Sequence, residues 1–162
     1  MDEWTLVVVL LGSIVALTGL ATIIVRPKFK GNIAIAVASI LGIFAGVAGA
    51  SHGPGEILQG DRAPSGIIIE AWPGLTSLGG EPAMTLIPNF RISGIVTIIL
   101  GSAVTIWAAT GIQSKNGSLV LISLSVTMLF VGGGLIPPIL GVTAGIIHWR
   151  LIVNLKASSQ KL

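Results

Sequence analysis

The sequence contains several apolar runs of about 20 residues that carry no charge. A helix needs roughly 20 such residues to cross the hydrocarbon core of a bilayer, which is about 30 Å thick. Charged residues make up 9% of the chain, whereas an ordinary soluble domain has about 25%. This pattern excludes a soluble globular enzyme and a disordered tail. It predicts an all-α, polytopic transmembrane helical bundle.

We expect one membrane domain over residues 1–162, with four to five spans and a structured exoplasmic loop. The predicted spans are residues 5–25, 31–50, 92–112, 118–135 and 138–155. Residues 51–91 form the predicted exoplasmic cap, because this segment is rich in Pro and Gly but too apolar for a free loop. In the four-span alternative, the last apolar region is a single kinked helix that ends on the membrane surface.

The charged residues predict the orientation. With five spans and the N-terminus outside, seven of the nine basic residues lie on the cytoplasmic side and all six acids lie outside. Because Lys and Arg are enriched in cytoplasmic loops, this arrangement favours a multi-pass protein of the cell membrane with a cytoplasmic C-terminus. The lipid bilayer is the expected partner. Nucleic acid is not, since the basic residues lie at the ends of apolar segments.

Small residues recur every four positions in the second, third and last predicted spans. The positions assigned to helix packing are Ala38, Gly42, Gly46, Gly101, Gly141 and Gly145. In lipid, helices associate through close backbone approach and van der Waals contact, which small side chains permit. Two interpretations stay open. The residues either pack helices within the chain or form a seam with another copy or another membrane protein.

A cluster of glycines and prolines interrupts the last apolar region. Glycine weakens a helix, and proline removes a donor and clashes with the preceding turn. We therefore predict a helix break formed by Gly132, Gly133, Gly134, Pro137 and Pro138. The break is either a tight outer turn between two spans or a discontinuous helix of the kind that transporters use for binding.

The candidate ligand-binding residues are His52, Glu56 and Glu81, which we place in the exoplasmic cap. A His with two carboxylates suits a small ligand, a divalent metal or general acid–base work. Alternatively, His52 caps the second span while the two acids bond loop amides or pair with Arg62 and Arg91. No acid or base falls at mid-depth in a predicted span, which argues against a proton-coupled transporter.

Near the C-terminal end of the last apolar run lie His148 and Arg150. Long basic side chains near helix ends reach toward the headgroups. We therefore expect both residues to lie at the membrane interface.

Three stretches carry a resemblance. They are residues 52–60 (HGPGEILQG), residues 80–85 (GEPAMT) with 87–89 (IPN), and residues 132–138 (GGGLIPP). Together they resemble a family of uncharacterised small prokaryotic multi-pass membrane proteins, over about residues 40 to 145. The resemblance implies that the cap and the Gly/Pro break form one architectural pattern. It implies no activity, cofactor or catalytic residue.

The expected function is that of a structural or accessory membrane subunit, which packs against a partner or a second copy through its small-residue stripes. One alternative is a membrane enzyme or a ligand- or lipid-binding protein with a site beneath the exoplasmic cap. Another is a small transporter or channel at the break. Nucleotide-binding, metalloprotease and nucleophile-elbow motifs are lacking, so an enzyme is not favoured. No cofactor or metal is assigned.

Overall fold

The computed structural model describes residues 33–69 and 82–159, together with Leu6, Val9, Ser13 and Leu20. These residues are mostly helical, in agreement with the expected class. The helices are α2 (Ile33–Leu58), α3 (Phe90–Thr110), α4 (Gly117–Leu129) and α5 (Ile136–Ser159). Two short strands, β1 (Ile68–Ile69) and β2 (Ala83–Met84), add a small antiparallel pair that the sequence did not predict.

Three of the described helices, α2, α3 and α5, are long and apolar enough to cross a membrane. Helix α4 is also apolar but has 13 residues, so it is only about 20 Å long at 1.5 Å per residue. The predicted first span, residues 5–25, lies outside the described residues except for Leu6, Val9, Ser13 and Leu20, which are helical.

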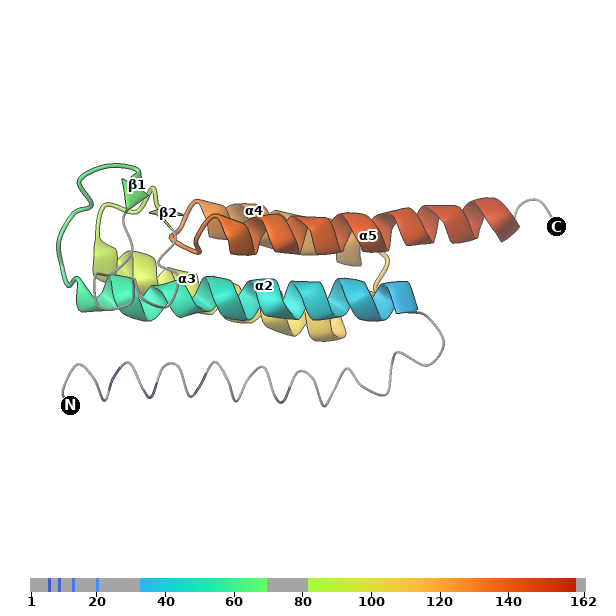
Figure 1. The fold of residues 1–162 in the computed structure, drawn as a ribbon, viewed down its shortest axis with the longest axis horizontal. Helices are drawn as coiled ribbons and strands as arrows, with labels where there is room; N and C mark the ends of the chain where they lie inside the picture. Colours follow the sequence, from blue (N-terminus) through green and yellow to red (C-terminus); the bar gives the residue numbers. More distant parts are fainter. Residues whose placement is uncertain are drawn as a thin grey trace.

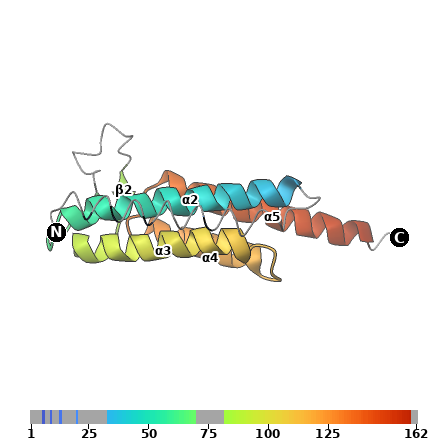
Figure 2. The ribbon, with the colours of Figure 1, turned by 90° about the horizontal axis from the view of Figure 1, so that it is seen from below.

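The four helices form a bundle in which successive helices run in opposite directions (Figure 1). Helix α2 packs against α3 and α5, and α4 packs against α5 and α3 (Figure 2). The two strands lie at the end of the bundle where α2 ends and α3 begins. We call residues 59–69 and 82–89 the cap. At the opposite end, the C-terminal part of α5 extends beyond the other helices.

A seam of small residues brings the backbones of α2 and α3 into contact. A Cβ atom on Gly46 would lie 2.5 Å from the Thr105 amide nitrogen and 2.6 Å from the Gly101 carbonyl oxygen. A Cβ atom on Gly101 would in turn lie 2.6 Å from the Gly46 carbonyl oxygen. Only hydrogen fits at such distances, so the absence of side chains at both positions sets the spacing of the two helices.

The other predicted packing residues also lie at contacts within the chain. Gly42 faces Ala108 of α3, and Ala38 is fully buried in the apolar core of the bundle. Gly141 and Gly145 of α5 lie against Ser125 and Ile122 of α4. The small-residue stripes are therefore occupied by neighbouring helices of the same chain.

Helix α2 continues eight residues beyond the predicted end at Ala50, so residues 51–58, expected in the cap, are helical. It passes through Pro54, which costs the helix one hydrogen bond. Packing against α3 explains why the helix persists, because Gly53 lies on Gly94 with no side chain between the two backbones. His52 and Glu56, expected in a loop, therefore lie on α2.

We predict that Gly46→Ala destabilises the bundle, because the added methyl group meets backbone atoms of α3 that cannot move independently. Overpacking of this kind costs about 1–3 kcal/mol. Thermal unfolding of the purified protein in mild detergent measures the effect.

The matched control is Gly66→Ala in the cap, where an added Cβ has no atom within 4 Å. This variant should unfold within about 0.5 kcal/mol of the wild type. Equal effects at the two glycines would contradict the close α2–α3 seam.

Candidate functional site beneath the cap

The chain leaves the helical conformation between the end of α4 at Leu129 and the start of α5 at Ile136. Gly132 and Gly134 have φ values of 104° and 78°, a region that favours glycine because it has no Cβ. Three of the five residues predicted to break the helix, Gly132, Gly133 and Gly134, lie in this connection. The other two, Pro137 and Pro138, lie in the first turn of α5, where a helix requires no amide donor.

This connection lies inside the bundle and not above it. The Val131 carbonyl oxygen accepts hydrogen bonds from the hydroxyls of Ser93 (3.0 Å) and Thr97. Thr97 lies seven residues into α3, about 10 Å below the start of that helix. Residues 130–135 therefore lie beside the first turns of α3. At this level of the bundle their backbone is not helical, whereas the backbone of α2 and α3 is.

The cap supplies two further hydrogen bonds to this backbone. The Gly132 amide donates to the Met84 carbonyl oxygen (2.8 Å), and the Leu86 amide donates to the Phe130 carbonyl oxygen (2.9 Å). β2 pairs with Ile68 and Ile69 of β1, and Thr85, directly after β2, forms an isolated antiparallel bridge with Val131. The two-stranded sheet and this bridge bring three segments that are far apart in the sequence together at one end of the bundle (Figure 1).

Glu56 of α2 is buried directly beneath this connection. Its side chain is 4% exposed, and neither carboxyl oxygen has a hydrogen-bond partner of good geometry. A Cβ atom on Gly132 would lie 2.6 Å from the Glu56 carboxyl carbon, so the carboxyl group faces the glycine turn. The Ser93 hydroxyl lies close enough to interact with it, although that hydroxyl is already engaged with Thr85 and Val131.

The two arginines considered as partners of Glu56 are engaged elsewhere. Arg91 forms an ion pair with Asp61 at 2.9 Å, and both side chains are more than half exposed. The Arg62 Nε atom donates to the Gln59 carbonyl oxygen at 2.9 Å. The prediction that Glu56 pairs with Arg62 or Arg91 is therefore wrong, and so is its assignment to a loop amide.

Beside the Glu56 carboxyl group lies a network of neutral oxygen atoms that begins at the Ser93 hydroxyl. The Thr85 and Ser93 hydroxyls lie 2.8 Å apart, and the Val131 carbonyl oxygen accepts from Ser93 and Thr97. Removing an ionised carboxylate from water without a partner costs several kcal/mol, so a group in this position either carries a proton or faces a cation.

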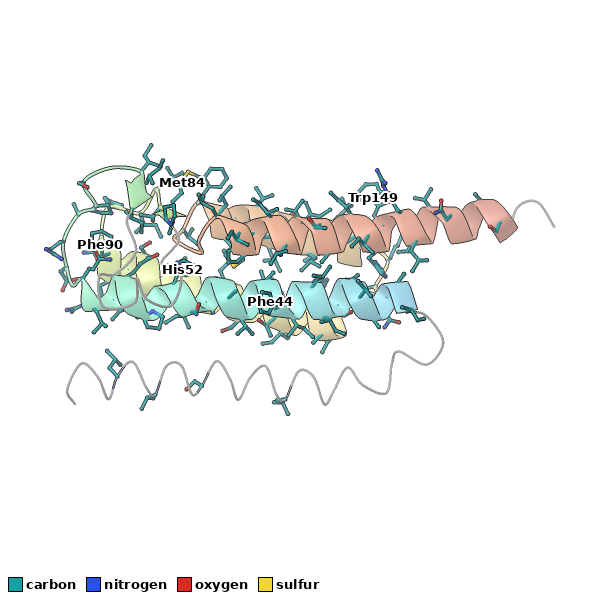
Figure 3. The ribbon with its side chains drawn as sticks, in the orientation of Figure 1. Phe44, His52, Met84, Phe90 and Trp149 are labelled. Carbon is teal, nitrogen blue, oxygen red and sulfur yellow. The ribbon has the colours of Figure 1, made fainter. Side chains whose placement is uncertain are left out.

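The other two candidate ligands do not complete a metal site. His52 lies one turn before Glu56 on α2 and is partly buried near the cap (Figure 3). Glu81 lies outside the described residues. Within residues 33–69 and 82–159, no three His, Cys, Asp or Glu side chains are grouped as metal ligands.

His148, which was expected at the membrane interface, is buried between helices. It is 2% exposed, and its Nδ1 atom lies 2.8 Å from the Ser118 hydroxyl oxygen. This buried contact joins α5 to the first turn of α4. Arg150, two residues further along α5, is exposed.

Sequence reasoning did not assign Thr85, Ser93, Thr97 and Val131 to the site. One signal was present, because Ser93 and Thr97 are four residues apart on the small-residue face of α3. Their common acceptor, Val131, is more than 30 residues away in the sequence, so the spacing alone did not identify it. Comparison with protein-family models, curated proteins and solved structures gave no match.

We predict that the double variant Ser93→Ala/Thr97→Val destabilises the protein, because the Val131 carbonyl loses both hydroxyl donors in a buried position. An unsatisfied buried acceptor costs about 1–3 kcal/mol. Thermal or denaturant unfolding in detergent measures this loss.

Thr127→Val is the control, because the Thr127 hydroxyl is exposed and donates only to Ser123 within its own helix. Its unfolding should match that of the wild type. If the double variant were as stable as this control, residues 130–135 would not depend on α3.

Proposed function

We propose that the chain is a multi-pass protein of the cell membrane that binds a small monovalent cation at Glu56, beneath an exoplasmic cap. Helices α2, α3 and α5 supply three spans, residues 5–25 supply another, and α4 with residues 130–135 completes the fifth. The positive-inside bias supports an external N-terminus and a cytoplasmic C-terminus. The observation that carries the proposal is the buried carboxyl group of Glu56, which has the Ser93 hydroxyl beside it but no cationic partner among the described residues.

Charge balance supports a monovalent ligand. Glu56 is the one acid buried among the described residues, and one negative charge is neutralised by one positive charge. A divalent ion would have only one carboxylate as a ligand. One of its two positive charges would then stay unbalanced in apolar surroundings. Hydroxyl and carbonyl oxygens, which Thr85, Ser93, Thr97 and Val131 provide, are the neutral ligands that hard cations prefer.

The position of Glu56 within a membrane span also supports a functional role. Ionisable groups in transmembrane segments are costly and mark binding sites or ion pathways. Transporters commonly form such sites where a helix is interrupted, and Glu56 lies against the interruption between α4 and α5. Cation transport is for this reason the second candidate function.

This proposed function differs from the one predicted from the sequence, which was that of a structural or accessory membrane subunit. That hypothesis depended on small-residue stripes available for another molecule. The space beside these stripes is instead occupied by the neighbouring helix of the same chain, at Gly42, Gly46 and Gly101. The stripes therefore no longer supply a reason for self-association.

Sodium should raise the thermal stability of the purified protein. The measurement replaces choline chloride with sodium chloride at constant ionic strength, with lithium and potassium chloride in parallel. A ligand that binds only the folded state at 100 times its Kd stabilises it by about 2.7 kcal/mol.

Glu56→Gln should abolish this response, because the amide keeps the size of the side chain but removes the charge. Asp61→Asn, at an exposed acid, should retain it. If none of the three alkali cations shifts the unfolding temperature, or if Glu56→Gln responds like the wild type, the proposal is wrong and Glu56 is a structural acid.

The proposed orientation predicts opposite labelling at the two ends of the bundle. The chain has no cysteine, so Asp61→Cys in the cap and Lys115→Cys in the α3–α4 turn can be tested singly. In intact cells, a membrane-impermeant maleimide should label position 61 at once and position 115 only after permeabilisation. The reverse pattern would contradict the orientation.

A further inference from the structure

A groove lies at the end of the bundle opposite the cap, between the start of α4 and the C-terminal half of α5. Its volume is about 210 Å³. The side chains of Leu119, Trp149, Ile152 and Val153 form apolar walls, and Lys115 and Asn116 form a polar rim. The groove is therefore amphipathic, with its polar atoms gathered at the turn between α3 and α4.

The walls face away from the protein core. Trp149 is 46% exposed and projects outward from α5 (Figure 3), and Val153 is 51% exposed. The buried contact between His148 and Ser118 joins α5 to α4 immediately behind the groove. The Trp107 indole also donates to the Gly117 carbonyl oxygen at 3.0 Å, which fixes the turn that carries the rim. These two contacts, one of them made by the lining residue Ser118, hold the start of α4 against α5 and α3.

The rim is positively charged and has no acidic neighbour in the sequence around it. Lys115 and Asn116 are exposed, and Arg150 is exposed on the adjoining turn of α5. No Asp or Glu occurs between Glu81 and the end of the chain, nor from Trp4 to Gly55. The segments that form this end of the bundle therefore contain no carboxylate to neutralise Lys115, so the charge fits an anion from outside the chain.

We infer that this groove binds one anionic phospholipid, with its phosphate at Lys115 and Asn116 and an acyl chain along Leu119, Ile152 and Val153. An amphipathic groove that opens toward the proposed membrane fits a ligand with an anionic head and an apolar tail. Trp149 lies at the boundary between the two, where amphipathic rings are enriched. The inference rests on the proposed membrane location and not on cation binding at Glu56.

The test uses the full-length protein reconstituted in bilayers of equal parts phosphatidylglycerol and phosphatidylcholine. The protein is extracted in mild detergent, and native mass spectrometry measures the retained lipid. The wild type should retain one phosphatidylglycerol in preference to phosphatidylcholine, and excess inorganic phosphate should not displace it. Equal retention of the two lipids, or displacement by phosphate alone, would overturn the inference.

Two variants locate the lipid. Lys115→Gln should lower phosphatidylglycerol retention about fivefold, as expected for one basic side chain near an anionic surface. Val153→Trp, which fills the apolar wall, should lower retention of the bound lipid whatever its headgroup. Arg62→Gln at the cap end should retain phosphatidylglycerol like the wild type. If Lys115→Gln and Arg62→Gln behave alike, the lipid does not bind in this groove.

The sodium response is measured in the same Lys115→Gln sample. It should be unchanged, because Glu56 lies near the end of α2 beneath the cap, whereas the groove lies at the turn between α3 and α4 at the other end of the bundle. A sample that loses the lipid preference but keeps the sodium response supports a lipid site that is separate from the cation site. Loss of both responses together would contradict that separation.

Discussion

The backbone between α4 and α5 is not helical and lies inside the bundle, so its hydrogen-bonding groups need partners from the protein. This requirement explains why polar side chains of α3 and the cap converge on residues 130–135. Ser93 and Thr97 donate to the Val131 carbonyl, and Met84 accepts from the Gly132 amide. The same contacts enclose Glu56, so the buried carboxyl group is a consequence of how the chain accommodates its helix break.

The small-residue seam makes this enclosure possible. Because Gly46 and Gly101 let α2 and α3 touch along their backbones, Ser93 of α3 comes within interacting range of Glu56 on α2. Gly53 and Gly94 continue the contact toward the cap and hold α2 helical beyond Pro54. Larger residues at these positions would separate the helices and leave the carboxyl group without its surrounding oxygens.

Much of the helical pattern could be predicted from the sequence, because hydropathy and small-residue spacing are local signals. The helix break at Gly132–Gly134 is local as well. The burial of Glu56 was not predictable, since it depends on Gly132, which is distant in sequence, and on packing that overrides Pro54. The burial of His148 was not predictable for a related reason: its partner Ser118 lies on another helix.

Hydrogen–deuterium exchange of residues 130–135 tests the central claim most directly. These residues are not helical, yet their backbone is enclosed by α2, α3 and the cap. The Gly132 amide should exchange about as slowly as the amides within α3, and far more slowly than those of the exposed residues 61–63. Exchange at the rate of those cap residues would show an open loop and would contradict a sealed site around Glu56.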